Sequence, residues 1–342
     1  MLVPRISVVV PAYNSAWSIG DTIRSVMAQT RRDFELLIVN DGSTDNLEEA
    51  IAPFAAVEPR LRIVPQRNGG LAAARNRGLA ESRGEFVAFL DADDIWHPDF
   101  LKLLSAALES NGDAAFAYAH SFRIDKANRL VPVPHWRHTP RHDFTGLLTL
   151  NSVGNGSAAL FRSRAVRNRG GFDVSLRERG VEGVEDWKLC LQLAFQHPPI
   201  LVARYLVGYR LSENSMSQVN PVRNLRSFSV VIDDIRTEFG SIDPRHFKNA
   251  RTLLNGWLLS SFLRKGEYTI LVRLIAQSYL LNPLWFLSRD LRAVHARKIA
   301  SLFLDLGERK LLAQLCENGA RPFAFLDAPG VPAPEARQSS SV

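Results

Sequence analysis

The chain has 342 residues, of which 46% are hydrophobic and 23% are charged. This composition is that of a globular protein and excludes a chain that is disordered throughout, while the length allows two domains with a sizeable core. The formal net charge is +7, and all of this excess lies in residues 201–342, which hold 19 Lys and Arg against 12 Asp and Glu. We expect either an anionic partner for this basic part or ordinary solvated arginines.

Cysteine usage and hydrophobic patterns favour a reducing, cytoplasmic location. The two cysteines, Cys190 and Cys316, exclude a disulfide framework and a zinc site. Cys190 lies in an apolar helical pattern, which predicts that its side chain is buried. Met1 leads directly into a strand-like run, so we expect no signal peptide. The sequence contains no uncharged apolar run of about 18 residues, so we also expect no membrane-spanning helix.

The first part of the chain alternates β-branched runs with segments of helical spacing. Strands are predicted over residues 6–10, 34–39, 61–64 and 86–90. Helices are predicted over residues 18–29, 47–57, 71–82 and 99–108. This alternation indicates βαβ units and a parallel sheet, and the continuous apolar strands indicate helices on both faces.

The middle of the chain is mixed, and the last third is helical. Strands are predicted over residues 114–120, 157–161 and 201–209, a helix over 184–195, and an irregular loop over 132–142. From residue 221 to about 316 helical periodicity dominates, so we place a domain boundary near Asn220. Residues 327–342 lack a hydrophobic pattern and are expected to be disordered.

Polar and acidic residues follow each of the first four predicted strands. These motifs are Pro11-Ala12-Tyr13-Asn14, Asp41-Gly42-Ser43-Thr44-Asp45, Asn68-Gly69-Gly70-Leu71 and Asp91-Ala92-Asp93-Asp94. Ligands of an open parallel sheet bind at the carboxyl ends of its strands. The sequence therefore predicts a binding site at that edge of the sheet.

The acidic motif after the fourth strand is the strongest of these signals. Three carboxylates within four residues repel one another, and a hard divalent cation such as Mg²⁺ or Mn²⁺ compensates this charge well when substrate phosphates complete its shell. The alternative is an acidic helix start, with Asp94 as a cap near Pro98. The position after a buried strand favours the metal interpretation.

Two further acidic motifs each allow two interpretations. Asp41 could accept hydrogen bonds from a base or ribose, or its motif could be a plain turn in which Thr44 or Asp45 caps the next helix. Glu185 and Asp186 open an apolar helical run. They could complement the helix dipole, or supply a general base.

Arg210 follows the last predicted strand and precedes a polar loop over residues 212–217. Such a loop could fold over a diphosphate, with Arg210 pairing to it. The alternative is an ordinary exit loop.

Taken together, these motifs resemble the inverting family 2 glycosyltransferases of GT-A fold over about residues 4–220. The resemblance also uses Leu71-Ala72-Ala73-Ala74-Arg75-Asn76, Glu185-Asp186 and Tyr209-Arg210. It implies an α/β fold with a Rossmann-like mixed, mainly parallel sheet flanked by helices. Nucleotide-sugar binding would occupy about residues 1–110 and the acceptor part about 111–220. A helical C-terminal region over 221–326 and the tail over 327–342 would follow.

The resemblance assigns roles in the donor site. Ala12 and Tyr13 would lie beside the base, Asp41 would bind it, and Arg75 would lie near the diphosphate. Asp91 would contact the ribose side of the donor. Asp93 would ligate Mn²⁺ or Mg²⁺. The resemblance also implies that the donor site includes Pro11, Asn14, Asn68, Gly70, Ala92 and Arg210.

The implied activity is hexosyl transfer with inversion. Asp186 would be the catalytic base with Glu185 beside it, and Trp187 would shape the acceptor pocket. One departure concerns Ser212, where many relatives carry a histidine near the metal. The donor would be a nucleotide sugar, with uridine diphosphate the commoner carrier, and the acceptor a saccharide or lipid-linked sugar of a bacterial surface polysaccharide or glycolipid.

The basic helical region allows two interpretations. Its apolar segments could pack on the catalytic domain, or could lie on the inner face of a membrane with Trp285 and Phe286 at the interface. A sugar nucleotidyltransferase is a rival function, although the first strand lacks its Gly-rich phosphate loop. A sugar-nucleotide-binding protein without catalysis is another. A nucleic-acid binder would not explain the acidic strand ends, so we expect no nucleic-acid partner.

Overall fold

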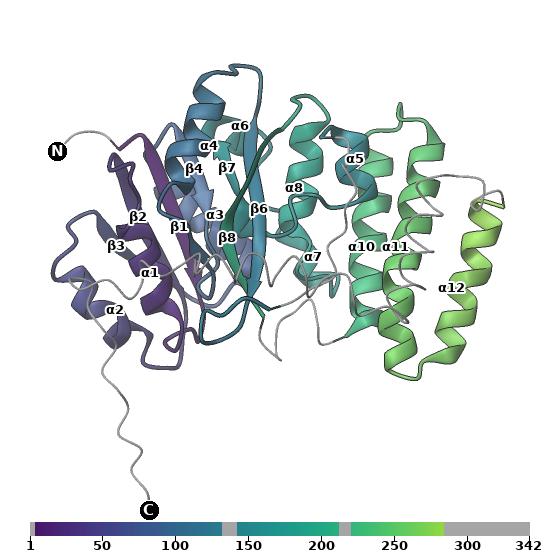
Figure 1. Ribbon diagram of the computed structural model, residues 1–342, viewed down its shortest axis with the longest axis horizontal. Helices are drawn as coiled ribbons and strands as arrows, with labels where there is room; N and C mark the ends of the chain where they lie inside the picture. Colours follow the sequence, from purple (N-terminus) through teal and green to yellow (C-terminus); the bar gives the residue numbers. More distant parts are fainter. Residues whose placement is uncertain (1–3, 132–141, 212–219, 284–342) are drawn as a thin grey trace, which may run out of the picture.

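A computed structural model describes residues 4–131, 142–211 and 220–283, in which one large sheet is followed by a group of helices (Figure 1). The strands are β1 (Ile6–Ala12), β2 (Phe34–Asp41), β3 (Leu61–Gln66), β4 (Phe86–Phe89), β5 (Ile95–Trp96), β6 (Phe116–Ile124), β7 (Ala159–Arg162) and β8 (Ile200–Arg210). The helices between them are α1 (Ile19–Met27), α2 (Leu47–Ala55), α3 (Leu71–Glu81), α4 (Phe100–Glu109), α5 (Phe144–Thr149), α6 (Ser163–Asn168), α7 (Ser175–Glu178) and α8 (Glu185–Ala194). The C-terminal helices are α10 (Pro221–Glu238), α11 (Pro244–Arg264) and α12 (Tyr268–Leu281).

The described strands form an eight-stranded sheet in the order β3-β2-β1-β4-β7-β6-β8-β5. The first four of these pair in parallel, as the βαβ pattern predicts. Strand β7 runs antiparallel to both of its neighbours, β6 and β8 are parallel, and β5 is antiparallel to β8. The predicted α/β fold with a mixed, mainly parallel sheet and a helical C-terminal region is therefore confirmed.

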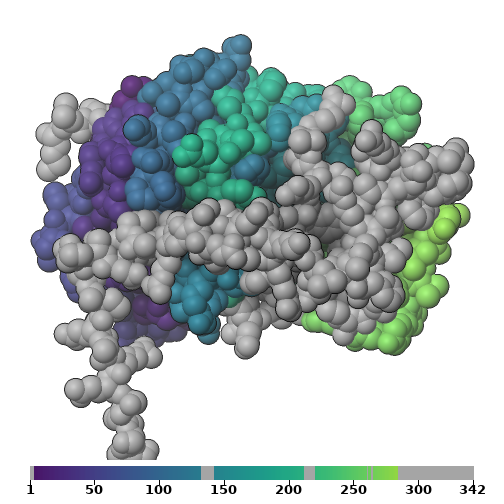
Figure 2. Space-filling model, viewed as in Figure 1, coloured from purple at the N-terminus to yellow at the C-terminus, as the bar shows by residue number. Residues whose placement is uncertain are grey.

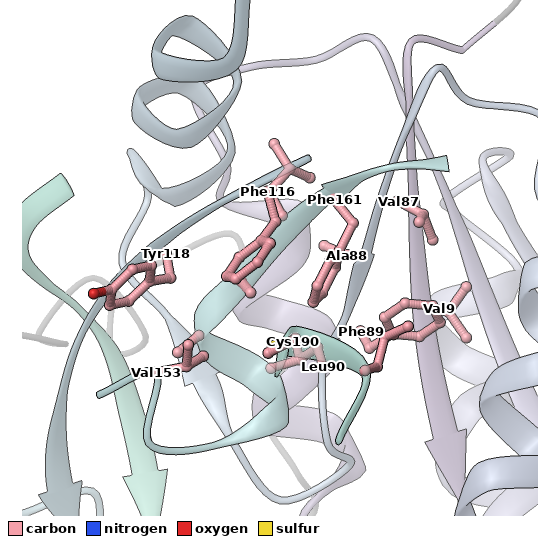
Figure 3. Close-up of a cluster of buried hydrophobic side chains, with 14 of the residues drawn as sticks. Val9, Val87, Ala88, Phe89, Leu90, Phe116, Tyr118, Val153, Phe161 and Cys190 are labelled. Carbon is pink, nitrogen blue, oxygen red and sulfur yellow. The ribbon is translucent and has the colours of Figure 1, made fainter. Parts of the chain in front are cut away.

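The sheet is buried on both faces, as its uninterrupted apolar strands predict. Every residue of β1 and β2 is buried. At the centre, Phe161 packs between Phe89 and Phe116, with ring centroids 6.0 Å and 5.4 Å away (Figure 3). Cys190 of α8 is buried in the same cluster, which confirms its predicted burial.

The parallel register brings the carboxyl ends of the strands to one edge. Ala12 at the end of β1 lies opposite Asn40 of β2, and Asp41 lies opposite Gln66 at the end of β3. The motifs that follow these strands therefore share this edge, where the sequence predicts the site.

Helix α10 begins where the domain boundary is predicted. The side chain of Asn220 accepts hydrogen bonds from the backbone N–H groups of Val222 and Arg223, and Pro221 occupies the first turn, which together define a helix start. Helices α10 and α11 adjoin the sheet-bearing part through α8 and α5, and α12 packs on α11 (Figure 1). Figure 2 shows the purple N-terminal part and the yellow-green α12 at opposite sides of the molecule. Within the described residues, no helix is both long enough and apolar enough to cross a membrane.

Some elements differ from the prediction or lie outside the described residues. The sequence reasoning missed the short strand β5 and helix α5, because neither is long enough to show a period. The strand predicted at 157–161 begins instead with a helical turn over Gly156–Ala158. Most of the predicted loop at 132–142, the polar loop with Ser212, the helical pattern at 284–316 with Cys316, and the tail at 327–342 all lie outside the described residues.

Candidate functional site

The acidic motif after β4 forms a tight turn that is held by the core. The N–H of Asp94 donates to the carbonyl of Asp91 at 3.0 Å, and the Asp94 side chain is fully buried. Its carboxylate accepts from Ser157 Oγ at 2.5 Å and from the N–H of Arg210 at 2.9 Å. Burial raises the pKa of Asp94 well above its usual value, as do the charges of Asp93 and Asp91. Asp94 therefore anchors the turn, and Asp99 holds the cap position of α4 instead.

The backbone of this turn is held from both sides. The Ala92 carbonyl accepts from Ser18 Oγ and Thr22 Oγ1, each at 2.9 Å. The Asp93 carbonyl accepts from Arg210 Nε at 2.6 Å. These contacts fix the Asp93 main chain.

Asp93 has the environment of a cation ligand. Its carboxyl is half-buried, and burial followed by the charge of Asp91 raises its pKa to about 6. The local excess of negative charge and the all-oxygen donor set fit Mg²⁺ or Mn²⁺. Among the described residues, no group of three or more His, Cys, Asp or Glu side chains is placed so that it could hold a metal ion.

Arg75 of α3 joins the acidic turn to the start of α8. Its side chain is buried, and it donates through Nη2 to Asp91 at 2.7 Å and through Nη1 to Glu185 at 2.6 Å. Burial opposes its charge, yet Asp91, Glu185 and Asp186 together raise the pKa of Arg75. The Arg75–Glu185 pair links residues 110 positions apart in the chain.

Asp186 lies beside this pair in the first turn of α8. Burial and then the negative charge of Glu185 raise its pKa to about 7, although Arg75 acts in the opposite direction. Gly156 closes the space around it: a Cβ atom added there would lie 3.5 Å from Asp186 Oδ2 and 2.5 Å from Arg75 Nη2. The structure therefore gathers Asp91, Arg75, Glu185 and Asp186 into one constellation, and Asp186 has the proton affinity of a base at neutral pH.

Asp41 organises the neighbouring loop between β3 and α3. Its carboxylate accepts from the N–H groups of Gly69 at 2.7 Å and Gly70 at 2.9 Å, and from Gln66 Nε2 at 2.6 Å. Asn68 Nδ2 donates to the Asp41 carbonyl at 3.0 Å. Gly70 has φ +87°, a conformation that suits glycine at this helix start. Asp41 thus holds the predicted donor-binding residues Asn68 and Gly70 in place, and its own contact with a base stays a prediction.

The loop after β1 is tied to the loop after β2. Asn14 has φ +50°, and its Oδ1 accepts from the N–H of Thr44 at 2.8 Å, while its own N–H donates to Ser43 Oγ at 3.1 Å. Pro11 and Ala12 are buried, whereas the Tyr13 side chain is 52% exposed. Tyr13 and Asn14 are therefore the exposed members of this motif.

Two predicted site residues make contacts in the protein interior. Arg210 is 1% exposed, and its Nη1 donates to the carbonyls of Asp125 and Lys126, each at 3.1 Å. Trp187 is 3% exposed, donates to the Leu147 carbonyl at 2.9 Å and packs on the ring of Phe228. These contacts support structural roles, so the diphosphate role of Arg210 and the acceptor role of Trp187 stay predictions.

Three residues at the site escaped the sequence reasoning. Ser157 bridges the acidic turn by accepting from the Asp91 N–H at 3.1 Å and donating to Asp94. Gly156 makes the close approach described above. Arg177 of α7 donates to Asn68 Oδ1 at 3.1 Å and lies against Gly70. In the sequence, Gly156 and Ser157 are a Gly-Ser pair before a predicted strand, and Arg177 is a basic residue in a glycine-rich segment. Both patterns are common in proteins, so neither indicated a site.

The described residues have the architecture of the GT-A class of α/β folds, which the solved structures described below share. Their sheet is mainly parallel, and an acidic turn after β4 lies beside the start of α8. Residues 7–170 match the family model described as Glycosyl transferase family 2.

The chain is similar to several curated proteins over part of its length. It is 39% identical over 146 residues to the uncharacterized glycosyltransferase YibD of Escherichia coli K12, covering 42% of this chain and 41% of that protein. It is 30% identical over 193 residues to the hyaluronan synthase of Pasteurella multocida, covering 56% of this chain and 19% of that protein. The chain spans about a fifth of the length of its Rickettsia relatives, which are uncharacterized glycosyltransferases.

Solved structures share the fold at low sequence identity. The mannosyltransferase PcManGT from Pyrobaculum calidifontis, in complex with GDP-Man and Mn²⁺, superimposes with a TM-score of 0.57 at 19% identity, covering 89% of this chain and 88% of that one. Residues 1–349 of S. aureus TarS, in complex with UDP-GlcNAc, give a TM-score of 0.54 at 19% identity and cover 87% and 92%. These likenesses support the fold.

Proposed function

We propose that the protein is an inverting glycosyltransferase of hexosyltransferase type, which moves a sugar from a nucleotide-sugar donor to an acceptor hydroxyl. One observation carries the proposal: Arg75 binds Asp91 after β4 and Glu185 at the start of α8, which brings Asp186 beside the acidic turn. The family 2 domain over residues 7–170 gives independent support. The catalytic region would comprise residues 1–220, with the helical region following it.

The nucleotide sugar would lie over the carboxyl ends of β1 to β4. The loops held by Asp41 and Asn14 present Tyr13, Asn68 and Gly70 at this edge, which suits a base and ribose. We propose a uridine diphosphate sugar. The TarS structure contains UDP-GlcNAc, whereas PcManGT contains GDP-Man, so a comparison of the two bases is part of the test.

In the proposed reaction, Asp186 accepts the proton of the acceptor hydroxyl. The hydroxyl oxygen then forms a bond to the anomeric carbon from the face opposite the departing phosphate, the bond to that phosphate oxygen breaks, and the configuration inverts. Arg75 pairs with both Asp91 and Glu185 in the wall of the site and offsets part of their negative charge. A Mn²⁺ or Mg²⁺ ion held by Asp93 and the diphosphate would stabilise the charge of the leaving nucleoside diphosphate.

The acceptor would be a saccharide or a lipid-linked sugar of a bacterial surface polysaccharide or glycolipid, with the enzyme at the cytoplasmic side of the membrane. Peripheral contact is supported by α12, where Tyr268, Val272, Ile275 and Tyr279 follow helical spacing and are each at least 41% exposed. Co-sedimentation with anionic liposomes at low salt tests this contact, and protein that stays in the supernatant would contradict it. Trp285 and Phe286 lie outside the described residues.

A donor screen tests the proposed function. Purified protein is incubated with uridine, guanosine and other diphosphate sugars, with and without Mn²⁺, and release of the nucleoside diphosphate is measured. We expect release from a uridine diphosphate sugar that depends on the cation. The Asp93→Ala variant should lose the cation-dependent rate, and Asp186→Asn should bind the donor but lose transfer to an acceptor. Full transfer by Asp186→Asn would remove this residue as the base.

A further inference from the structure

Lys188 of α8 is a buried cation with two carboxylate partners on different elements. It lies three residues after Glu185 and is 7% exposed. Its Nζ donates to Asp173 Oδ2 at 2.6 Å and to Asp234 Oδ2 of α10 at 2.7 Å. Burial alone would lower the pKa of Lys188, but the two carboxylates raise it above its usual value. The ammonium group therefore stays charged and joins α8 to both neighbours.

Asp234 also holds the segment that leads into α8. Its two oxygens accept from Arg179 Nη1 and Nη2 at 2.7 Å and 2.8 Å, a two-point pairing that fixes orientation as well as distance. Arg226, also on α10, donates to the Arg179 carbonyl at 2.8 Å. Arg223 pairs with Glu182 at 3.1 Å. One face of α10 thus binds residues 179–182, immediately before Glu185 and Asp186.

The other partner of Lys188 is connected to the helix of Arg75. Asp173 follows Phe172, whose N–H and carbonyl are both bound by the Asn76 side chain at 2.8 Å. The Phe172 ring lies 5.2 Å from the Arg75 guanidinium. Lys188 therefore joins α8 directly to α10, and it reaches α3 indirectly through Asp173 and the neighbouring Phe172.

We infer that Asp234 of the C-terminal helical region is a positioning residue for the reaction centre: through Lys188 and Arg179 it holds the start of α8, and with it Asp186, in register with Arg75. This inference rests on the proposed function. It makes α10 part of the catalytic architecture, even though the family 2 match ends at residue 170. Arg177, two residues before Arg179, touches the loop after β3 at Asn68. Because that loop is held by Asp41, we expect the junction to affect nucleotide binding less than kcat.

The full-length Asp234→Ala variant tests the inference beside a matched control. Asp233 is its chain neighbour on α10, is more exposed and pairs with Arg251 of α11 instead. For each variant we measure kcat for transfer, the Kd of the uridine diphosphate by calorimetry, and hydrogen exchange of a peptide covering residues 179–189. For Asp234→Ala we expect kcat to fall about tenfold to a hundredfold, since small displacements of reacting groups have effects of this size. Its Kd should change much less than its kcat, and its 179–189 amides should exchange faster.

Asp233→Ala should match the wild type in all three measurements. If both variants keep wild-type kcat, or if Asp234→Ala loses nucleotide affinity in proportion to kcat, the positioning role is overturned. A wild-type protein that is inactive with every donor would overturn the proposed function, and the inference with it. Conversely, an active wild type with a fully active Asp234→Ala variant would overturn the inference alone.

Discussion

Replacing Arg75 by methionine is expected to destabilise the fold and to displace the pH dependence of the reaction. Methionine has a similar length, so packing changes little, but Glu185 loses the cation 2.6 Å from its carboxylate while its side chain is only 7% exposed. Removing one partner of a buried ion pair typically costs about 3–5 kcal/mol, because the other charge stays buried and uncompensated. We expect a loss of this size in the free energy of unfolding of Arg75→Met.

The same substitution acts on Asp186. Arg75 lowers the pKa of Asp186, which burial and Glu185 raise to about 7. Without Arg75 this pKa should rise further, so the pH at which transfer reaches half of its maximum should move to higher values. Urea unfolding followed by circular dichroism measures the first effect, and the pH profile of kcat/KM measures the second.

Arg77 provides the control, because it lies on the same helix with 49% side-chain exposure and pairs with Glu81 one turn later. Arg77→Met should cost less than about 0.5 kcal/mol. Adding Glu185→Gln to Arg75→Met should restore part of the stability, since it removes the uncompensated charge. An exposed ion pair contributes at most about 1 kcal/mol. If the free energy of unfolding of Arg75→Met lies within that amount of the wild-type value, and its pH profile is not shifted, the reasoning about this buried pair is refuted.

Three further predictions concern single features of the site. In the wild type, kcat/KM should rise with pH through about 7 and then level off, because Asp186 must lose its proton before it can accept one; a profile flat from pH 5 to 9 would contradict its role as base. Gly156→Ala should lower kcat/KM about tenfold to a hundredfold, because the added Cβ atom would displace Arg75. The control Gly112→Ala, whose Cβ atom would meet nothing within 4 Å, should leave kcat/KM unchanged, and equal activities of the two variants would contradict the close approach. Asp41→Ala should weaken nucleotide binding in calorimetry by releasing the loop after β3, and an unchanged Kd would show that the loop is held without it.

The sequence determined the order and type of the main elements. The continuous apolar runs at β1 and β2 predict buried strands, and both are buried at every residue. The helical spacing at α1 and the change of character near Asn220 also predict what the structure contains. These features are local: side-chain periodicity reports the type of an element and the face that it buries. Parallel strands also share an edge, so the sequence could place Asp41 and Asp91 on the same side of the sheet.

Tertiary structure alone decided which side chains meet. Nothing in the sequence indicates that Arg75 pairs with Glu185, or that Arg210 and Trp187 point into the interior. Nor could periodicity distinguish Lys188 from a solvated lysine, although it is a buried cation that joins α8 to α10 and to Asp173. Such contacts depend on the angles at which helices pack and on the paths of the loops between them. Those angles and paths follow from the packing of the whole chain, whereas a periodic pattern is complete within a single element.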